Sequence, residues 1–112
     1  MAIRLGKPWI KLEAAAVARL PGQLGVYQIA DDRGAVLFIG FAGGRTLFGL
    51  RSELEAWLER RAGRPTQFRY EVNMQYSSRY QELLMLHVAD HGRLPPENDE
   101  GERRRLGRLS PH

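Results

Sequence analysis

The chain has 112 residues, 43% hydrophobic and 27% charged, which is typical of one globular domain with one core and excludes a disordered or fibrous protein. It has no cysteine, which excludes a disulfide framework and a thiolate zinc site, and no apolar run near the roughly 18 residues of a membrane helix. The net charge is +4 and fifteen of the seventeen basic residues are arginine, which suits either a polyanionic partner or a coding bias toward arginine.

The first half of the chain predicts a helix followed by a β-hairpin. Residues 9–20 hold three consecutive alanines between apolar positions, which favours a helix that ends at Pro21-Gly22. Gly25–Ala30 and Ala35–Gly40 are β-rich runs separated by turn residues, which is typical of a hairpin. Because the second run is almost entirely apolar, we expect it to be a central strand buried on both faces.

The second half predicts a helix, a strand and another helix. The first helix is expected over about 46–62, before Gly63, with its core face marked by apolar residues at three- and four-residue steps. Gly49 and the capping pattern from Ser52 to Glu55 leave its start open by one turn. The residues of that face are Leu47, Leu50, Leu54, Trp57 and Leu58. Residues 67–76 alternate apolar and polar side chains, as a half-buried strand does. Ser78 and Gln81 form a capping box that opens a last helix, which Gly92 closes.

These elements predict an α+β fold in which a small three-stranded antiparallel sheet is flanked by helices. We expect residues 1–98 to form this single domain and residues 99–112 to be a polar, arginine-rich tail. Within the tail, Arg103–Arg105 is either a solvated charge run or an arm on nucleic acid. The N-terminal residues lack the pattern of a signal peptide, so we expect a soluble, cytoplasmic protein with no membrane partner; the oligomeric state stays open.

The hairpin also carries a motif. Gly25-Val26-Tyr27, followed after ten residues by Phe38-Ile39-Gly40, resembles the signature of the GIY-YIG nuclease domain, and the resemblance extends from about Pro21 to Asn98. It implies a GIY-YIG-like fold and an enzyme that hydrolyses phosphodiester bonds of nucleic acid, DNA in preference to RNA. It also implies one divalent metal ion as cofactor, magnesium or manganese.

The resemblance further implies which residues act. In the family, a hairpin tyrosine positions or deprotonates a water, a helix arginine binds the scissile phosphate, and a late asparagine fastens the site. Tyr27, Arg51 and Asn98 match these three catalytic positions. Arg45 competes with Arg51 for the position that binds the nucleic-acid phosphate.

Two positions depart from the family pattern. Phe38 replaces the second tyrosine, so a hydroxyl that the family uses on the attacking water is missing. His87 stands in place of the metal-binding glutamate, and Glu82, five residues earlier, is the other candidate ligand. Because magnesium prefers oxygen ligands, His87 would suit a softer ion such as zinc or nickel, with His91 four residues later and Asp90 as further ligands.

Each candidate also has a purely structural interpretation. Tyr27 can be a core aromatic, Arg51 a surface arginine paired with Glu55, His87 a buried or capping histidine, and Asn98 the cap of a turn. Two further functions therefore stay open beside the nuclease: a nucleic-acid-binding domain that does not cut, and a small protein-interaction scaffold.

Overall fold

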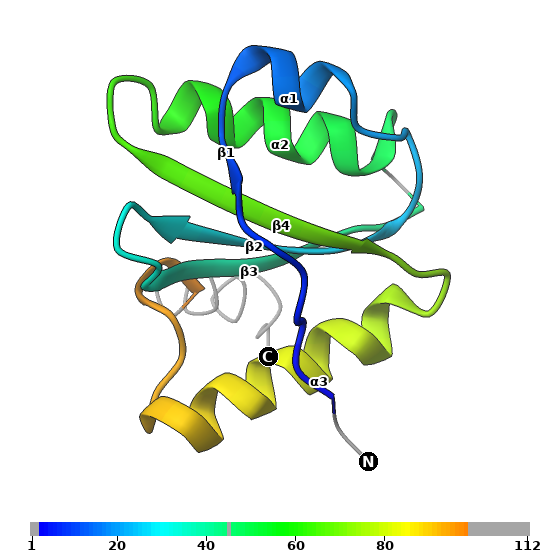
Figure 1. The fold of residues 1–112 in the computed structure, drawn as a ribbon. Helices are drawn as coiled ribbons and strands as arrows, with labels where there is room; N and C mark the ends of the chain where they lie inside the picture. Colours follow the sequence, from blue (N-terminus) through cyan, green and yellow to red (C-terminus); the bar gives the residue numbers. More distant parts are fainter. Residues whose placement is uncertain (1–2, 45, 99–112) are drawn as a thin grey trace, which may run out of the picture.

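The computed structural model describes residues 3–44 and 46–98. In chain order its elements are β1 (Ile10–Lys11), α1 (Ala14–Ala18), β2 (Gly25–Asp31), β3 (Val36–Ala42), α2 (Gly49–Arg60), β4 (Thr66–Val72) and α3 (Tyr76–His91). The strands form one antiparallel sheet in the order β1-β4-β2-β3. Helices α1 and α2 cover one face of the sheet and α3 covers the other, so the α+β prediction is confirmed (Figure 1).

The predicted hairpin is confirmed as β2 and β3. Its turn is held by Asp31, whose carboxylate accepts hydrogen bonds from the backbone N–H groups of Arg33 and Ala35, both at 2.9 Å. These bonds, above all the one from Ala35, hold the pKa of the Asp31 carboxyl below its usual value. The register that follows sets Tyr27 directly opposite Gly40.

The two inner strands are β4 and β2, so the expectation that the second hairpin strand would be central is wrong. β3 pairs with β2 alone and lies at the edge of the sheet. Its apolar side chains are covered by helices instead of by flanking strands. Phe38 packs against the core beneath α1 and α2, and Ile39 packs into the core beneath α3. An apolar strand therefore indicates two covered faces, and it does not indicate two neighbouring strands.

The helix predicted over 9–20 is also wrong at its start. Ile10–Lys11 form a short strand that pairs with β4, and Leu12 donates its N–H to the Thr66 carbonyl at 2.9 Å. Only Ala14–Ala18 are helical, and Glu13 at the N-cap makes no side-chain hydrogen bond to the helix. The open edge of β4 offers backbone partners that outweigh the modest helix propensity of this segment. The sheet consequently has four strands and not three.

The start of α2 falls within the turn that the sequence left open, whereas α3 begins before its predicted capping box. α2 starts at Gly49, which leaves Leu47 82% exposed and off the core face that it was expected to share with Leu54. β4 stops at Val72, and α3 begins at Tyr76 without the expected capping box. α3 ends as predicted, because Gly92 caps it in the left-handed conformation. α2 ends at Arg60, slightly before the predicted end, and turn residues lead from there to the left-handed Gly63.

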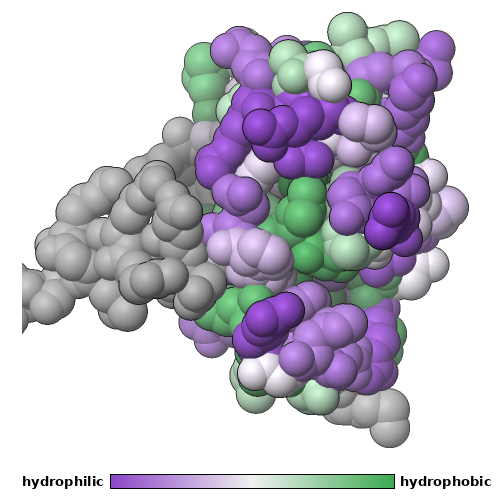
Figure 2. All heavy atoms as spheres, turned by 90° about the vertical axis from the view of Figure 1, so that its left-hand side faces the viewer, coloured by the Kyte–Doolittle hydropathy of each residue, from purple (hydrophilic) through white to green (hydrophobic). Residues whose placement is uncertain are grey.

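The expectation of one core is wrong, because the sheet separates two apolar cores, one under each helical layer. The larger core lies beneath α1 and α2 and contains Val17, Leu20, Tyr27, Ile29, Ala42, Leu50, Leu54, Trp57 and Phe68. The smaller core lies beneath α3 and contains Leu5, Val26, Ile39, Tyr80 and Leu83. The end of the molecule that carries the hairpin turn is mostly hydrophilic, with one apolar area between the layers (Figure 2).

Within the described residues, no helix is both long and apolar enough to cross a lipid bilayer. The arginine-rich tail expected over residues 99–112 lies outside the described residues.

Candidate functional site

A pocket of about 220 Å³ opens beside the edge strand β3. Its lining residues are Tyr27, Phe38, Gly40, Phe41, Thr46, Glu53 and Tyr80. Glu53 comes from α2 and Tyr80 from α3, so the pocket connects the two helical layers. The layers meet here past the outer edge of β3, which pairs with no second strand among the described residues.

Tyr27 is the buried polar centre of this pocket. Its side chain is 1% exposed, and its hydroxyl donates to Glu53 Oε1 at 2.9 Å while accepting from the Trp57 indole N–H at 3.2 Å. Burial, assisted by the negative charge of Glu53, raises the pKa of Tyr27 well above its ordinary value. The phenol therefore keeps its proton at neutral pH and acts as a donor that orients Glu53 rather than as a base.

The last glycine of the hairpin motif makes room for that phenol. A Cβ atom at Gly40 would lie 2.6 Å from the Tyr27 hydroxyl and 2.5 Å from Cε2 of Phe38. Since contacts this short do not occur between real atoms, only glycine lets the tyrosine ring lie across the strand. The motif thus has a local packing explanation, in which Tyr27 and Gly40 face each other across the hairpin.

Glu53 is the carboxylate of the pocket, and sequence reasoning missed it. It is half-buried, and its Oε2 accepts a hydrogen bond of 3.4 Å from the Thr46 hydroxyl. Its spacing in the sequence could have identified it, because Glu53 lies three residues after Leu50 and four before Trp57, both of which are buried. A carboxylate beside the buried stripe of a helix needs a polar partner, and here Tyr27 provides it.

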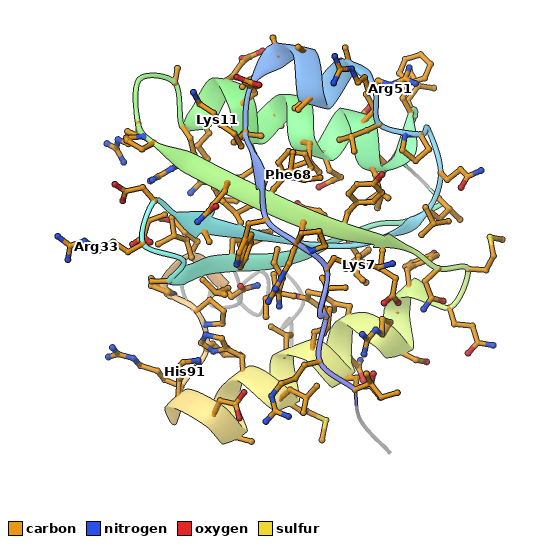
Figure 3. The ribbon with its side chains drawn as sticks, viewed as in Figure 1. Lys7, Lys11, Arg33, Arg51, Phe68 and His91 are labelled. Atoms are coloured by element: carbon orange, nitrogen blue, oxygen red, sulfur yellow. The ribbon has the colours of Figure 1, made fainter. Side chains whose placement is uncertain are left out.

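Arg51 is not part of the pocket. Its Nε and Nη2 atoms donate to the carbonyl oxygen of Leu20 at 3.0 and 2.9 Å, so its fork ties α2 to the end of the segment that carries α1. Figure 3 places Arg51 in this helical layer, on the side of the sheet opposite His91. The structure therefore brings Tyr27 together with a carboxylate but not with the predicted arginine.

This geometry predicts a structural role for Arg51. Replacing Arg51 by methionine keeps the aliphatic stem but removes both hydrogen bonds to Leu20, so we expect a loss of about 1–2 kcal/mol in the free energy of unfolding. Urea denaturation followed by circular dichroism measures it. Arg64→Met, at an exposed position, is the control and should change stability by less than about 0.5 kcal/mol. Equal stabilities of the two variants would contradict the role.

Asn98 is buried against the edge of the sheet. Its side-chain amide accepts from the Ile39 N–H at 2.7 Å and donates to the Ile39 carbonyl at 2.8 Å. The amide thus pairs with the outer edge of β3 as a neighbouring strand would. Asn98 fastens the segment after α3 to the strand that carries Gly40, without lining the pocket itself.

The two candidate metal ligands lie apart. His87 lines a different cavity, and its Nδ1 is 2.9 Å from the Arg93 carbonyl. Burial lowers the pKa of His87. Glu82 pairs with Arg79, which also binds Glu71. Across residues 3–44 and 46–98, no three His, Cys, Asp or Glu side chains are grouped so that they could hold a metal ion.

The second candidate arginine, Arg45, lies outside the described residues.

A family described as a domain of unknown function (DUF7508) matches residues 3–90, which is most of the chain and includes Tyr27, Gly40 and Glu53. No curated protein matches the sequence.

Proposed function

The chain belongs to the DUF7508 family, and we propose that it hydrolyses phosphodiester bonds of nucleic acid, DNA in the first place, with Glu53 as the acting carboxylate. The observation that carries the proposal is the 2.9 Å hydrogen bond from the buried Tyr27 hydroxyl to Glu53 in an open pocket. The likeness of the hairpin to the GIY-YIG signature supplies the substrate class. A divergent GIY-YIG-like fold is part of the same proposal.

The donor set of the pocket fits a hard divalent cation. Glu53 offers a carboxylate and Thr46 a hydroxyl, and magnesium or manganese is commonly held by one or two carboxylates completed by water and substrate phosphate. When bound, such an ion would offset the charge of the phosphodiester and lower the pKa of a coordinated water. His87 and Glu82 do not fit this role, because each is engaged elsewhere on α3.

The remaining residues of the pocket have distinct roles in this proposal. Tyr27 orients Glu53 through its hydroxyl, which burial keeps protonated. Phe38 and Phe41 form an apolar wall that limits the access of water. Phe38 stands where the family motif has its second tyrosine. Tyr80, from α3, nevertheless brings another tyrosine side chain to the pocket beside Tyr27. Arg51 serves stability and is not assigned to the phosphate.

A nucleic-acid-binding domain that does not cut is the second candidate. The observation that favours it is the absence of any lysine or arginine among the described residues that line the pocket. Phosphoryl transfer commonly uses a cation over the developing negative charge. Arg45 precedes the pocket residue Thr46 in the chain and lies outside the described residues.

The direct test is nicking of supercoiled plasmid with magnesium or manganese. We expect Glu53→Gln to lower the rate by about a hundredfold or more, because it removes the carboxylate charge while conserving shape. Glu55→Gln is the matched control, since Glu55 is exposed on the same helix and should leave the rate unchanged.

Arg51→Met separates stability from chemistry. Measured well below its unfolding temperature, it should cut like the unmodified protein, because Arg51 binds a backbone carbonyl outside the pocket. If Glu53→Gln cuts as fast as Glu55→Gln, the assignment of Glu53 is wrong. Salt-sensitive binding without any cutting would support the second candidate instead.

A further inference from the structure

On the face of the sheet opposite Tyr27, a second cavity of about 100 Å³ lies between the sheet, the last turns of α3 and the N-terminal segment. Its polar lining consists of Arg4, Gln28, Arg69, His87, Asp90 and His91. Leu5 and Leu83, which line it as well, belong to the smaller core. A group of arginines and histidines against an apolar core is unusual and requires a physical reason.

Arg69 is the central residue of this cavity. Its Nε donates to Gln28 Oε1 at 2.7 Å, its Nη1 donates to the Lys7 carbonyl at 3.2 Å, and its guanidinium lies 4.1 Å from the centre of the Trp9 ring. Gln28 itself is only 7% exposed on the inner strand β2. The guanidinium is therefore held in one orientation by three neighbours before any ligand arrives.

The charge of Arg69 has no counter-ion within the part of the chain that the structure describes. Among the described residues, no carboxylate forms an ion pair with it, and its burial lowers its pKa. Arg79, on the same face of the sheet, has its charge neutralised by carboxylates, because it forms ion pairs with both Glu71 and Glu82. A half-buried cation without a partner is costly, and an anion in the cavity would offset that cost.

The other groups around the cavity also suit an anion. Arg4 is already paired with Asp90, whose two carboxylate oxygens accept from its Nη2 and Nε at 2.6 and 2.9 Å. That pair is neutral overall, so the positive charge of Arg69 remains. The rings of His87 and His91 lie 4.3 Å apart, and His87 uses Nδ1 on the Arg93 carbonyl. His91 can donate one ring N–H to an anion, whereas His87, whose Nδ1–H is given to the Arg93 carbonyl, can donate from Nε2 only when it is protonated.

We propose that this cavity binds a small oxyanion, a phosphate or sulfate group, with Arg69 as the principal ligand and Arg4 and His91 beside it. The forked N–H donors of arginine match the oxygens of a tetrahedral anion better than they match chloride. This inference goes beyond the proposed function and does not depend on it, because the cavity and the Tyr27 pocket share no lining residue.

The test is an NMR titration of the ¹⁵N-labelled full chain with sodium sulfate and inorganic phosphate at neutral pH and constant ionic strength. The two tryptophans provide an internal comparison. We expect saturable shifts at the Trp9 indole and the Arg69 Nε–H, because both lie at the cavity. The Trp57 indole, bonded to Tyr27 on the other face, should not move. Shifts that do not saturate, or that centre on Trp57, would overturn the proposal.

Variants locate the binding. Arg69→Lys keeps the charge but loses the fork and the fixed orientation, and we expect affinity to fall about tenfold or more. Arg4→Gln changes an exposed side chain, so it should weaken binding without endangering the fold. Arg19→Gln, exposed at the end of α1 on the other face, makes the same charge change and should bind like the unmodified protein. Equal affinity of all three variants would refute the site.

The bound oxyanion could be a free ion or the phosphate group of a larger molecule, and a titration with a phosphate monoester distinguishes the two. If glycerol 3-phosphate binds with the same Trp9 and Arg69 shifts, the cavity recognises the phosphate group of a larger molecule. If only inorganic phosphate and sulfate give these shifts, the ligand is the free anion. Both outcomes support an oxyanion site, whereas the absence of saturable binding by any of these three probes would exclude one.

Discussion

Replacing Gly25 by alanine is expected to destabilise the protein by about 3 kcal/mol or more. A Cβ atom at Gly25 would lie 2.1 Å from the carbonyl oxygen of Glu71 and 3.0 Å from Cα of Val72. Both are backbone atoms of β4, which pairs with β2 at this position. A side chain can rotate away from such a clash, but paired strands can only separate, and β4 and β2 are the two inner strands of the sheet.

Urea denaturation followed by circular dichroism measures the effect. Gly44→Ala is the matched control, because a Cβ atom there meets nothing within 4 Å. It should change the free energy of unfolding by less than about 0.5 kcal/mol. If Gly25→Ala is no less stable than Gly44→Ala, the close approach of β2 and β4 at this end of the sheet is wrong.

Replacing Asn98 by alanine is expected to cost about 2–4 kcal/mol. Asn98 is 1% exposed and satisfies both the N–H and the carbonyl of Ile39, whose side chain is fully buried. Without the amide, both backbone groups lose their partner in a region with little access for water. The amide proton of Ile39 should also exchange faster with solvent, which hydrogen-exchange NMR detects.

Two comparisons make this result specific. Glu97→Ala, next in the chain, removes a surface ion pair with Arg60 and should cost under about 1 kcal/mol. Asn98→Asp keeps one acceptor but buries a carboxylate opposite the Ile39 carbonyl, which raises the pKa of that carboxyl. Its stability deficit should therefore shrink as the pH falls toward about 4, where the acid regains a proton to donate. A deficit independent of pH would contradict the pairing with Ile39.

The hairpin motif shows which features of the structure a short sequence pattern can indicate and which it cannot. The Gly25-Val26-Tyr27 and Phe38-Ile39-Gly40 pattern predicted a hairpin correctly, since strand propensity and the Asp31 turn act within a few residues. The resemblance to the family placed Tyr27 and Arg51 in one catalytic site, whereas the Tyr27 hydroxyl meets Glu53 and Arg51 binds the Leu20 carbonyl. The side chain that reaches a given point depends on how α2 lies on the sheet, and no local pattern contains that information.

Local signals alone determined much of this protein: the α+β class, the hairpin, and the end of α3 at Gly92. Propensity, helical period and left-handed glycines act over one or two turns of chain, so they can be read directly. Tertiary structure decided the rest. It placed β3 at the edge, drew Ile10–Lys11 into the sheet, and assigned Arg51 to a backbone carbonyl. Strand order and side-chain partners depend on contacts between residues far apart in the chain, which become defined only when the layers pack.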